Sequence, residues 1–94
     1  MRRIPRKDAN HSAIVKSLQA TGALVYDTAG VGGGFPDLMV SFRGVIRLLE
    51  IKDGNKPKSA RKLTKQEADF FLVWSEHVHI VNNETEALQS IGAI

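Results

Sequence analysis

A predicted hairpin between Asp37 and Lys52 constrains this chain more than any other feature. Residues 38–42 and 45–51 are rich in aliphatic side chains, and the Arg-Gly pair between them is typical of a two-residue hairpin turn. Such a turn fixes the pairing of the strands, and in that register Asp37 faces Glu50 across the ladder. Side chains alternate along a strand, so Lys52 projects on the same face as Glu50. The sequence therefore predicts two carboxylates and one lysine close together at the end of the hairpin.

The hydrophobic pattern predicts an α/β chain in the order helix, three strands, helix, strand, helix. The expected elements are a helix that begins at Ala9, is capped by Asp8 and ends at Gly22, strands over 23–26, 38–42 and 45–51, a helix opened by the capping-box sequence 64–67, a strand over 78–81 and a helix capped by Asn83. Because both hairpin strands are apolar on both faces, we expect a sheet that is covered on both sides. The polar segment 53–63 contains Gly54 and Pro57 and is expected to form a surface loop.

Length and composition are those expected of one intracellular domain. The chain has 94 residues and no cysteine, which excludes disulfides and thiolate zinc sites and is compatible with a reducing cytoplasm. No segment is apolar for long enough to act as a secretory signal or to cross a membrane. We therefore expect a cytoplasmic domain over 8–94, preceded by a basic arm over 1–7.

Basic residues gather in two short segments, although the net charge is only +3. They are Arg2, Arg3, Arg6 and Lys7 in the arm, and Lys56, Lys58, Arg61 and Lys62 in the loop after the hairpin. Both clusters are candidate contacts for DNA phosphates. The alternative is that they are solvated segments that keep the domain soluble.

Two motifs give the chain a resemblance to a known superfamily. Pro36-Asp37 stands at the head of the second strand and Glu50-Ile51-Lys52 at the end of the third, as in the PD-(D/E)xK nucleases. The glycine-rich approach to Asp37, the run 48–54 and the Leu-Thr-Lys-Gln sequence at 63–66 resemble the virus-type replication-repair nuclease domain, VRR-NUC, of the stand-alone phage or prophage type. This resemblance covers 8–94 and implies a small restriction-endonuclease-like fold, αβββαβα, with helices flanking a mixed sheet.

The resemblance also implies a function. Proteins of this type are expected to be metal-dependent, structure-selective endonucleases that hydrolyse phosphodiester bonds in branched DNA, in particular Holliday junctions, and to act as homodimers. A dimer suits symmetric cutting because a two-fold axis relates its active sites. Branched DNA and a second copy are thus the expected partners, in the cytoplasm of a bacterial host. No nucleotide cofactor is expected, because no Gly-Lys-Ser or Gly-Lys-Thr follows the glycines to form a P-loop.

The expected catalytic residues are Asp37, Glu50, Lys52 and Gln66. Asp37 and Glu50 would bind Mg²⁺ or Mn²⁺, which prefer oxygen ligands, and by resemblance the Ile51 carbonyl is a third ligand. Lys52 would position or activate the attacking water, and a role as base would require a lowered pKa. By resemblance, Gln66 would hold the water or the scissile phosphate. The alternatives are an ordinary ion pair between Asp37 and Lys52, and a solvated Gln66 at a helix start.

His11 departs from the family pattern, in which a glutamate often follows an asparagine at the place of Asn10. It precedes the apolar residues of its predicted helix at helical spacing, so its side chain is expected to face inward and is a further candidate metal ligand. Imidazole would weaken magnesium relative to manganese. The alternative is a buried histidine satisfied by hydrogen bonds. The substitution leaves open a second function, a module that binds DNA junctions with little or no catalysis.

His77 and His79 flank Val78 at a spacing that could mimic a metal site. We expect them instead to be exposed polar residues at a strand edge. Trp74 and Tyr26 are expected to be core or interface residues, not platforms for stacked bases.

Overall fold

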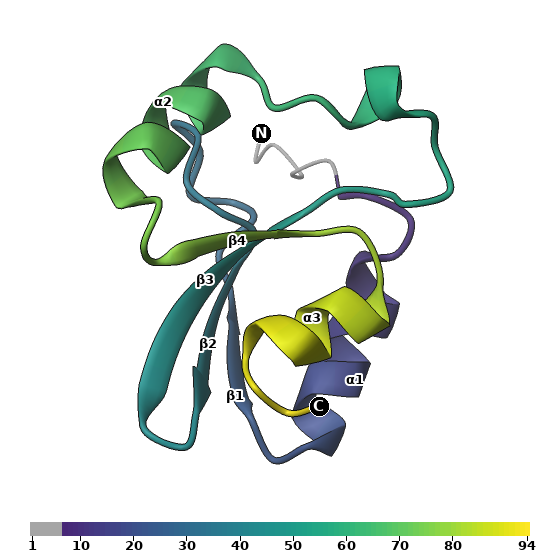
Figure 1. Cartoon of the computed structure of the whole chain (residues 1–94), viewed down its shortest axis with the longest axis vertical. Coiled ribbons are helices and arrows are strands. Elements are labelled where there is room, and N and C mark those ends of the chain that lie inside the picture. The colour runs from purple at the N-terminus through teal and green to yellow at the C-terminus, as the bar shows by residue number, and fades with distance from the viewer. Residues whose placement is uncertain (1–6) are drawn as a thin grey trace, which may run out of the picture.

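The computed structural model describes residues 7–94, which form a four-stranded mixed sheet with helices beside it (Figure 1). The elements are α1 (His11–Ala20), β1 (Leu24–Asp27), β2 (Leu38–Phe42), β3 (Val45–Ile51), the 3-10 helix η1 (Lys58–Arg61), α2 (Lys65–Trp74), β4 (Val78–Val81) and α3 (Glu84–Ser90). The strand order is β1-β2-β3-β4, with antiparallel pairing up to β3 and parallel pairing of β3 with β4. The predicted small α/β fold and its element order are confirmed.

The hairpin of β2 and β3 has the predicted register. Phe42 pairs with Val45 and Leu38 pairs with Leu49. The two turn residues, Arg43 and Gly44, have φ values of 51° and 79°. This left-handed pair is the two-residue turn whose twist matches the flanking strands. Position 37 therefore comes next to position 50 where the ladder ends.

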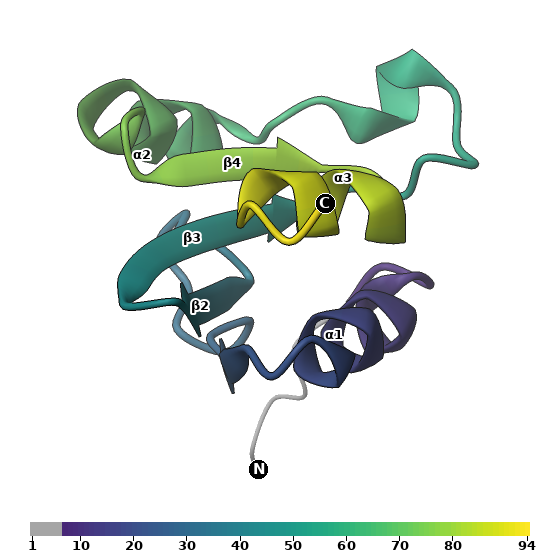
Figure 2. The same ribbon diagram turned by 60° about the horizontal axis from the view of Figure 1, so that its bottom comes forward.

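The core lies between one face of the sheet and the helices α1 and α3, which pack side by side (Figure 2). Its buried side chains are Ile14 and Leu18 from α1, Ala23 before β1, Leu38, Val40, Leu49, Ile51 and Val81 from the sheet, and Ala87 and Ile91 from α3 and its end. Each fully buried Leu or Ile contributes about 1.5–3 kcal/mol relative to an exposed one. This core holds the strand ends that carry the predicted site.

The expectation that the sheet is covered on both sides holds for only part of its second face. Leu24, Tyr26, Met39 and Ile46 share that face through the strand pairing, and their side chains are all exposed, Leu24 to 73%. The helix α2 lies at the other end of the sheet from the hairpin turn (Figure 1). A strand's hydrophobic pattern shows that a face can be covered, but not how far a helix reaches along it.

The start of α1 also differs from the prediction. The helix begins at His11, not at Ala9, and its N-cap residue Asn10 makes no capping hydrogen bond with its side chain. Instead, Asn10 Nδ2 donates to the carbonyls of Lys52, at 3.1 Å, and Asn82, at 2.9 Å. The side chain that could have capped the helix thus ties it to the ends of β3 and β4.

Several further expectations can be compared with the structure. Gly22, at φ 88°, ends α1 as predicted, and β1 begins one residue later than predicted. The segment 53–63 is not wholly a loop, because it contains η1. No described helix is long and apolar enough to span a membrane.

The predicted capping box at the start of α2 is confirmed. The Thr64 hydroxyl accepts from the Glu67 amide, and the Glu67 carboxylate accepts from the Thr64 amide. This first turn lies against the glycine-rich loop, where a Cβ on Gly34 would collide with the backbone of Gln66. Phe35 and Phe70 continue the contact, with ring centroids 5.3 Å apart. The missing side chain at Gly34 therefore lets α2 approach the head of β2.

Candidate active site

A polar hollow of about 590 Å³ lies where the end of β3 meets the segment before α1 and the start of α2. Its lining residues are Lys7, Asp8, Asp37, Glu50, Lys52, Lys56, Ala60, Lys62, Thr64 and Glu67. The structure thus brings together three of the predicted catalytic side chains, Asp37, Glu50 and Lys52, and three of the predicted basic ones.

Asp37 is held in place by the backbone of β3. Its amide donates to the Leu49 carbonyl at 2.9 Å, and its Oδ2 accepts from the Ile51 amide at 2.8 Å. The amides of Leu48 and Lys52 donate towards β4, so Ile51 turns its backbone groups towards β2. On that side the Ile51 amide meets the Asp37 carboxylate, and the Ile51 carbonyl points the same way. The Asp37 carboxylate and the Ile51 carbonyl therefore both lie at the boundary between β2 and β3.

Glu50 is only 4% exposed although it is a carboxylic acid. Burial, together with the nearby carboxylate of Asp37, raises the pKa of Glu50 to about 10. Charge from Glu67 acts in the same direction, and Lys52 opposes it only in part. The protein alone therefore does not balance two negative charges at this point.

Lys52 is bound to a carboxylate that the sequence reasoning did not assign to the site. Its Nζ donates to Glu67 Oε1 at 2.9 Å, and the same oxygen accepts from the Thr64 amide at 2.8 Å. Burial disfavours the charge on Lys52, but Glu67 and Glu50 outweigh it and raise its pKa above the ordinary value. Burial likewise disfavours the charge on Glu67, but the bonds from Lys52 and Thr64 prevail and lower its pKa. Lys52 is therefore held as a cation in the metal-free protein, and its role in positioning or activating the attacking water stays a prediction.

Gln66 lies in the first turn of α2 but does not line the hollow. Gln66 is exposed, and its backbone lies close to Gly34. Its neighbour Glu67 is the α2 residue that reaches Lys52. The catalytic role of Gln66 stays a prediction. The signal for Glu67 was the capping box, which by itself predicts only a helix start.

His11 is buried, at 4% exposure, and faces a carboxylate of β1. Its Nε2 lies 3.0 Å from Asp27 Oδ2, and Lys7 Nζ donates to the same oxygen at 2.8 Å. Burial raises the pKa of Asp27, but Lys7, the Ala29 amide and His11 together lower it to about 2. His11 does not line the hollow. This geometry supports the interpretation of His11 as a buried histidine that is satisfied by hydrogen bonds. Ligation of a metal by His11 stays a prediction.

The predicted phosphate contacts are distributed around this site. Lys7, Lys56 and Lys62 line the hollow, Lys58 and Arg61 belong to the neighbouring η1, and Arg2, Arg3 and Arg6 lie outside the described residues. Lys7 is paired with Asp27, and Lys56 Nζ lies 3.8 Å from Asp8 Oδ1. Lysines therefore lie along the rim of the hollow that contains the Asp37 and Glu50 carboxylates.

The other residues singled out in the sequence lie elsewhere. Tyr26 is 66% exposed and Trp74 is 47% exposed, so neither belongs to the core. His77 is exposed, whereas His79 is partly buried; burial lowers the pKa of His79, and Arg47 lowers it further. Within residues 7–94, no three His, Asp or Glu side chains form a preassembled metal-binding group. Asp37 and Glu50 bring two carboxylates together, and their binding of a metal ion stays a prediction.

A solved structure described as a VRR_NUC domain is similar to this chain. The two share 28% sequence identity with a TM-score of 0.56, over 89% of this chain and 96% of that chain. No family model matches the sequence, and no curated protein matches it. Likeness in both fold and sequence confirms the resemblance to VRR-NUC domains that the motifs predict.

Proposed function

We propose that this protein is a metal-dependent, structure-selective endonuclease that hydrolyses phosphodiester bonds in branched DNA, with Holliday junctions as its expected substrate. The observation that carries the proposal is the shared hollow in which the Asp37 and Glu50 carboxylates meet Lys52 below a rim of lysines. The likeness to a VRR_NUC domain supports it. By resemblance, the protein acts as a homodimer of phage or prophage origin.

The residues of the hollow fit a hard divalent cation. Asp37 and Glu50 and the carbonyl of Ile51 offer only oxygen ligands, which suit Mg²⁺ and Mn²⁺. The raised pKa of Glu50 means that the protein alone disfavours its ionised form, and a bound divalent cation would favour that form by offsetting its charge. When bound, the metal would neutralise charge at the phosphorus centre and acidify a water molecule.

The side chains have separate tasks in this proposal. Asp37, fixed by the Ile51 amide, holds its carboxylate in one orientation. Lys52, fixed by Glu67, presents a positive charge to the phosphate as negative charge grows on its oxygens in the transition state. Lys56 and Lys62 contact phosphates on either side of the reacting one. Such contacts carry no sequence information, so the shape of the DNA selects the substrate.

A second candidate function is a junction-binding module with negligible catalysis. The observation that favours it is the pairing of His11 with Asp27, because a family glutamate at this position would add an acid to the site. Both functions predict DNA binding that weakens with salt. They differ in what happens to the DNA after binding.

The test is cleavage of a labelled four-way junction and a matched linear duplex in EDTA, Mg²⁺ or Mn²⁺. We expect paired incisions in the junction that require the metal and disappear in Glu50→Ala, while this variant still binds the junction. Glu76→Ala is the matched control, because Glu76 is exposed and distant in sequence from the hollow. Tight binding without cutting in either metal would favour the junction-binding module.

A further inference from the structure

The hollow of the candidate site contains a carboxylate that the proposed function does not use. Asp8 lines this hollow together with Asp37 and Glu50. Its side chain is 30% exposed, and its Oδ1 lies 3.8 Å from the Nζ atom of Lys56, another residue of the lining. Asp8 therefore brings a third negative charge to the hollow, in a loose pair with a lysine of the rim.

The start of α1 fixes Asp8 beside the end of β3. The carbonyl of Asp8 accepts from the His11 amide at 3.1 Å, so Asp8 belongs to the turn that opens the helix. Asn10, in the same turn, donates its Nδ2 to the Lys52 carbonyl at 3.1 Å. Burial lowers the pKa of Lys52, but charge from Asp8 is among the causes that raise it above its ordinary value. The Asp8 carboxylate thus lies close enough to the candidate catalytic residues to affect their charges.

His11, three positions later, faces a different part of the molecule. Its Nε2 lies 3.0 Å from Asp27 Oδ2, and it does not line the hollow. Among the described residues at the start of α1, Asp8 is therefore the acid that reaches the candidate site.

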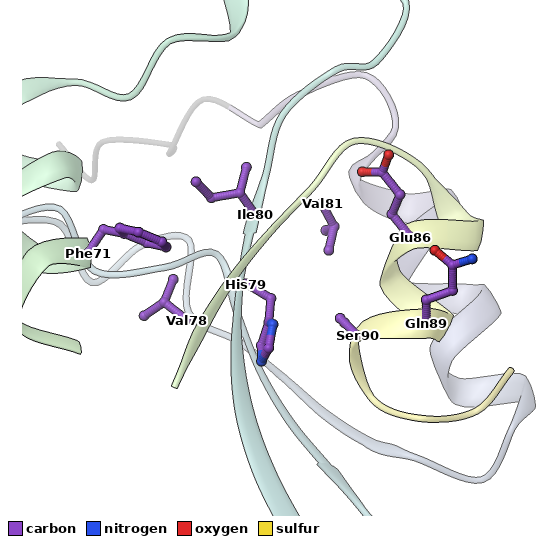
Figure 3. A pocket seen from close by; sticks show the side chains of 8 residues that line it. All are labelled: Phe71, Val78, His79, Ile80, Val81, Glu86, Gln89 and Ser90. Carbon is purple, nitrogen blue, oxygen red and sulfur yellow. The ribbon is translucent and has the colours of Figure 1, made fainter. Parts of the chain in front are cut away.

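Another hollow, of about 560 Å³, lies along β4 and has a different lining (Figure 3). Of the described residues that line it, Glu86 is the one acid, and none is a lysine or arginine. Glu86 also has partners within the protein, because its Oε1 accepts from the amide of Asn82 at 2.8 Å and from its Nδ2 at 2.9 Å. Carboxylates and lysines gather instead at the hollow that contains Asp8.

We propose that Asp8 is the third acid of the metal site, and that Lys56 pairs with it until a DNA phosphate binds this lysine. The proposal rests on the proposed function, which supplies both the metal and the phosphate. Within residues 7–94, no three acidic or histidine side chains form a preassembled metal-binding group. Asp8 therefore acts on the cation across a water molecule, since Mg²⁺ usually keeps several waters in proteins.

The pair of Asp8 and Lys56 is suited to exchange. The Lys56 side chain is 52% exposed, and ion pairs between exposed side chains are weak. A DNA phosphate offers Lys56 charged oxygens and a stronger, charge-assisted hydrogen bond. Once Lys56 binds the phosphate, the charge on Asp8 is no longer offset, and the hollow attracts a divalent cation more strongly. Binding of DNA and binding of metal then favour each other.

Mn²⁺ binding to the DNA-free protein, measured by isothermal titration calorimetry, tests the role of Asp8 without any cleavage. Asp8→Asn should weaken Mn²⁺ binding about 10-fold, the usual effect of losing a carboxylate that acts on a metal indirectly. Asp69→Asn removes the same charge from an exposed ion pair on α2 and should bind Mn²⁺ as the wild type does. Both variants should unfold at the wild-type temperature in EDTA. Unchanged Mn²⁺ affinity in Asp8→Asn would overturn the proposal.

A second variant tests the role of Lys56. Lys56→Gln should tighten Mn²⁺ binding about 2- to 5-fold, because a weak competing ion pair is lost. Lys65→Gln, from the exposed pair with Asp69, should leave the affinity unchanged. In the double variant with Asp8→Asn, the tightening should disappear, because Lys56 acts through Asp8. Equal tightening with and without Asp8 would show that Lys56 repels the cation directly and would overturn its pairing role.

Cleavage assays separate this proposal from the proposed function. Mn²⁺ binding that depends on Asp8, in a protein that cuts no junction, overturns only the proposed function. Metal-dependent junction cleavage, together with a Mn²⁺ affinity that does not depend on Asp8, overturns only the role of Asp8.

Discussion

The Nζ atom of Lys52 lies 2.9 Å from Glu67 Oε1, the same oxygen that accepts the Thr64 amide at 2.8 Å. One carboxylate therefore completes the capping box of α2 and holds the lysine of the candidate site. The position of that lysine depends on the start of α2.

Replacement of Glu67 by Gln should separate these two roles. A glutamine keeps the capping box, so we expect stability to change by less than about 1 kcal/mol. The charge that holds Lys52 is lost, and a charge-assisted hydrogen bond is worth about 1.5–3 kcal/mol, so the cleavage rate should fall roughly 10-fold or more. Single-turnover cleavage and thermal unfolding measure the two effects. Asp69→Asn, on the same helix but exposed, is the control and should cleave normally.

Neutralisation of Glu50 should stabilise the metal-free protein at high pH. Its pKa is about 10 in the folded state and near 4.5 in the unfolded state, so the folded state binds the proton more tightly. Stability is then greatest below pH 4.5 for this group and falls as pH rises towards 10, by at most about 1.4 kcal/mol per pH unit. Glu50→Gln should remove this slope in melting curves between pH 5 and 9 in EDTA. An unchanged slope would show that Glu50 is ionised in the free protein.

Divalent metal should reverse that loss in the wild type. A ligand that binds only the folded state stabilises it by about 2.7 kcal/mol at a concentration roughly 100 times its dissociation constant. We expect Mg²⁺ and Mn²⁺ to raise the melting temperature at pH 8 in wild type but not in Asp37→Asn. Equal shifts in both proteins would place the metal elsewhere.

The Asp27 carboxylate should contribute to stability in acid. Its pKa is lowered to about 2, so its contribution is present above its ordinary value of 3.8 and is lost as pH falls through 2. The side chain is 40% exposed, and screening limits the contribution to about 1 kcal/mol or less. Asp27→Asn should lower stability at pH 7 and shift acid unfolding to higher pH. Asp69→Asn, whose side chain is more exposed, should shift it less.

Lysines on the rim should affect DNA binding through salt. Each phosphate contact contributes a slope of about −0.9 to the dependence of log K on log salt. Lys62→Gln should therefore weaken junction binding and reduce that slope by about one, measured by fluorescence anisotropy. Lys16→Gln, on the exposed side of α1, should leave the slope unchanged.

The acidic pair could be predicted because its position depends on local chemistry. An Arg-Gly turn fixes the register of two adjacent strands, and that register alone places Asp37 beside Glu50. The element order could be read for a similar reason, since hydrophobic periodicity and capping residues act within a few positions of the chain.

The contacts that the sequence did not predict join segments that lie far apart. Asn10 bonds to Lys52 and Asn82 instead of capping its own helix, and Glu67 reaches a lysine 15 positions earlier. The partner of His11, Asp27, lies on a different element for the same reason. In each case a local motif was visible, but its second partner is set by how α1 and α2 pack on the sheet.

Because Gly34 has no side chain, it determines how closely Glu67 can approach Lys52 in the candidate site. Its left-handed φ of 85° and its close approach to Gln66 leave no room for a Cβ. Any side chain at position 34 would push α2 outward, and Glu67 would move with it, away from Lys52. Residue 34, which is uncharged and touches neither metal nor DNA, would then control the position of the Lys52 side chain. The size of residue 34 therefore sets the arrangement of the candidate catalytic residues.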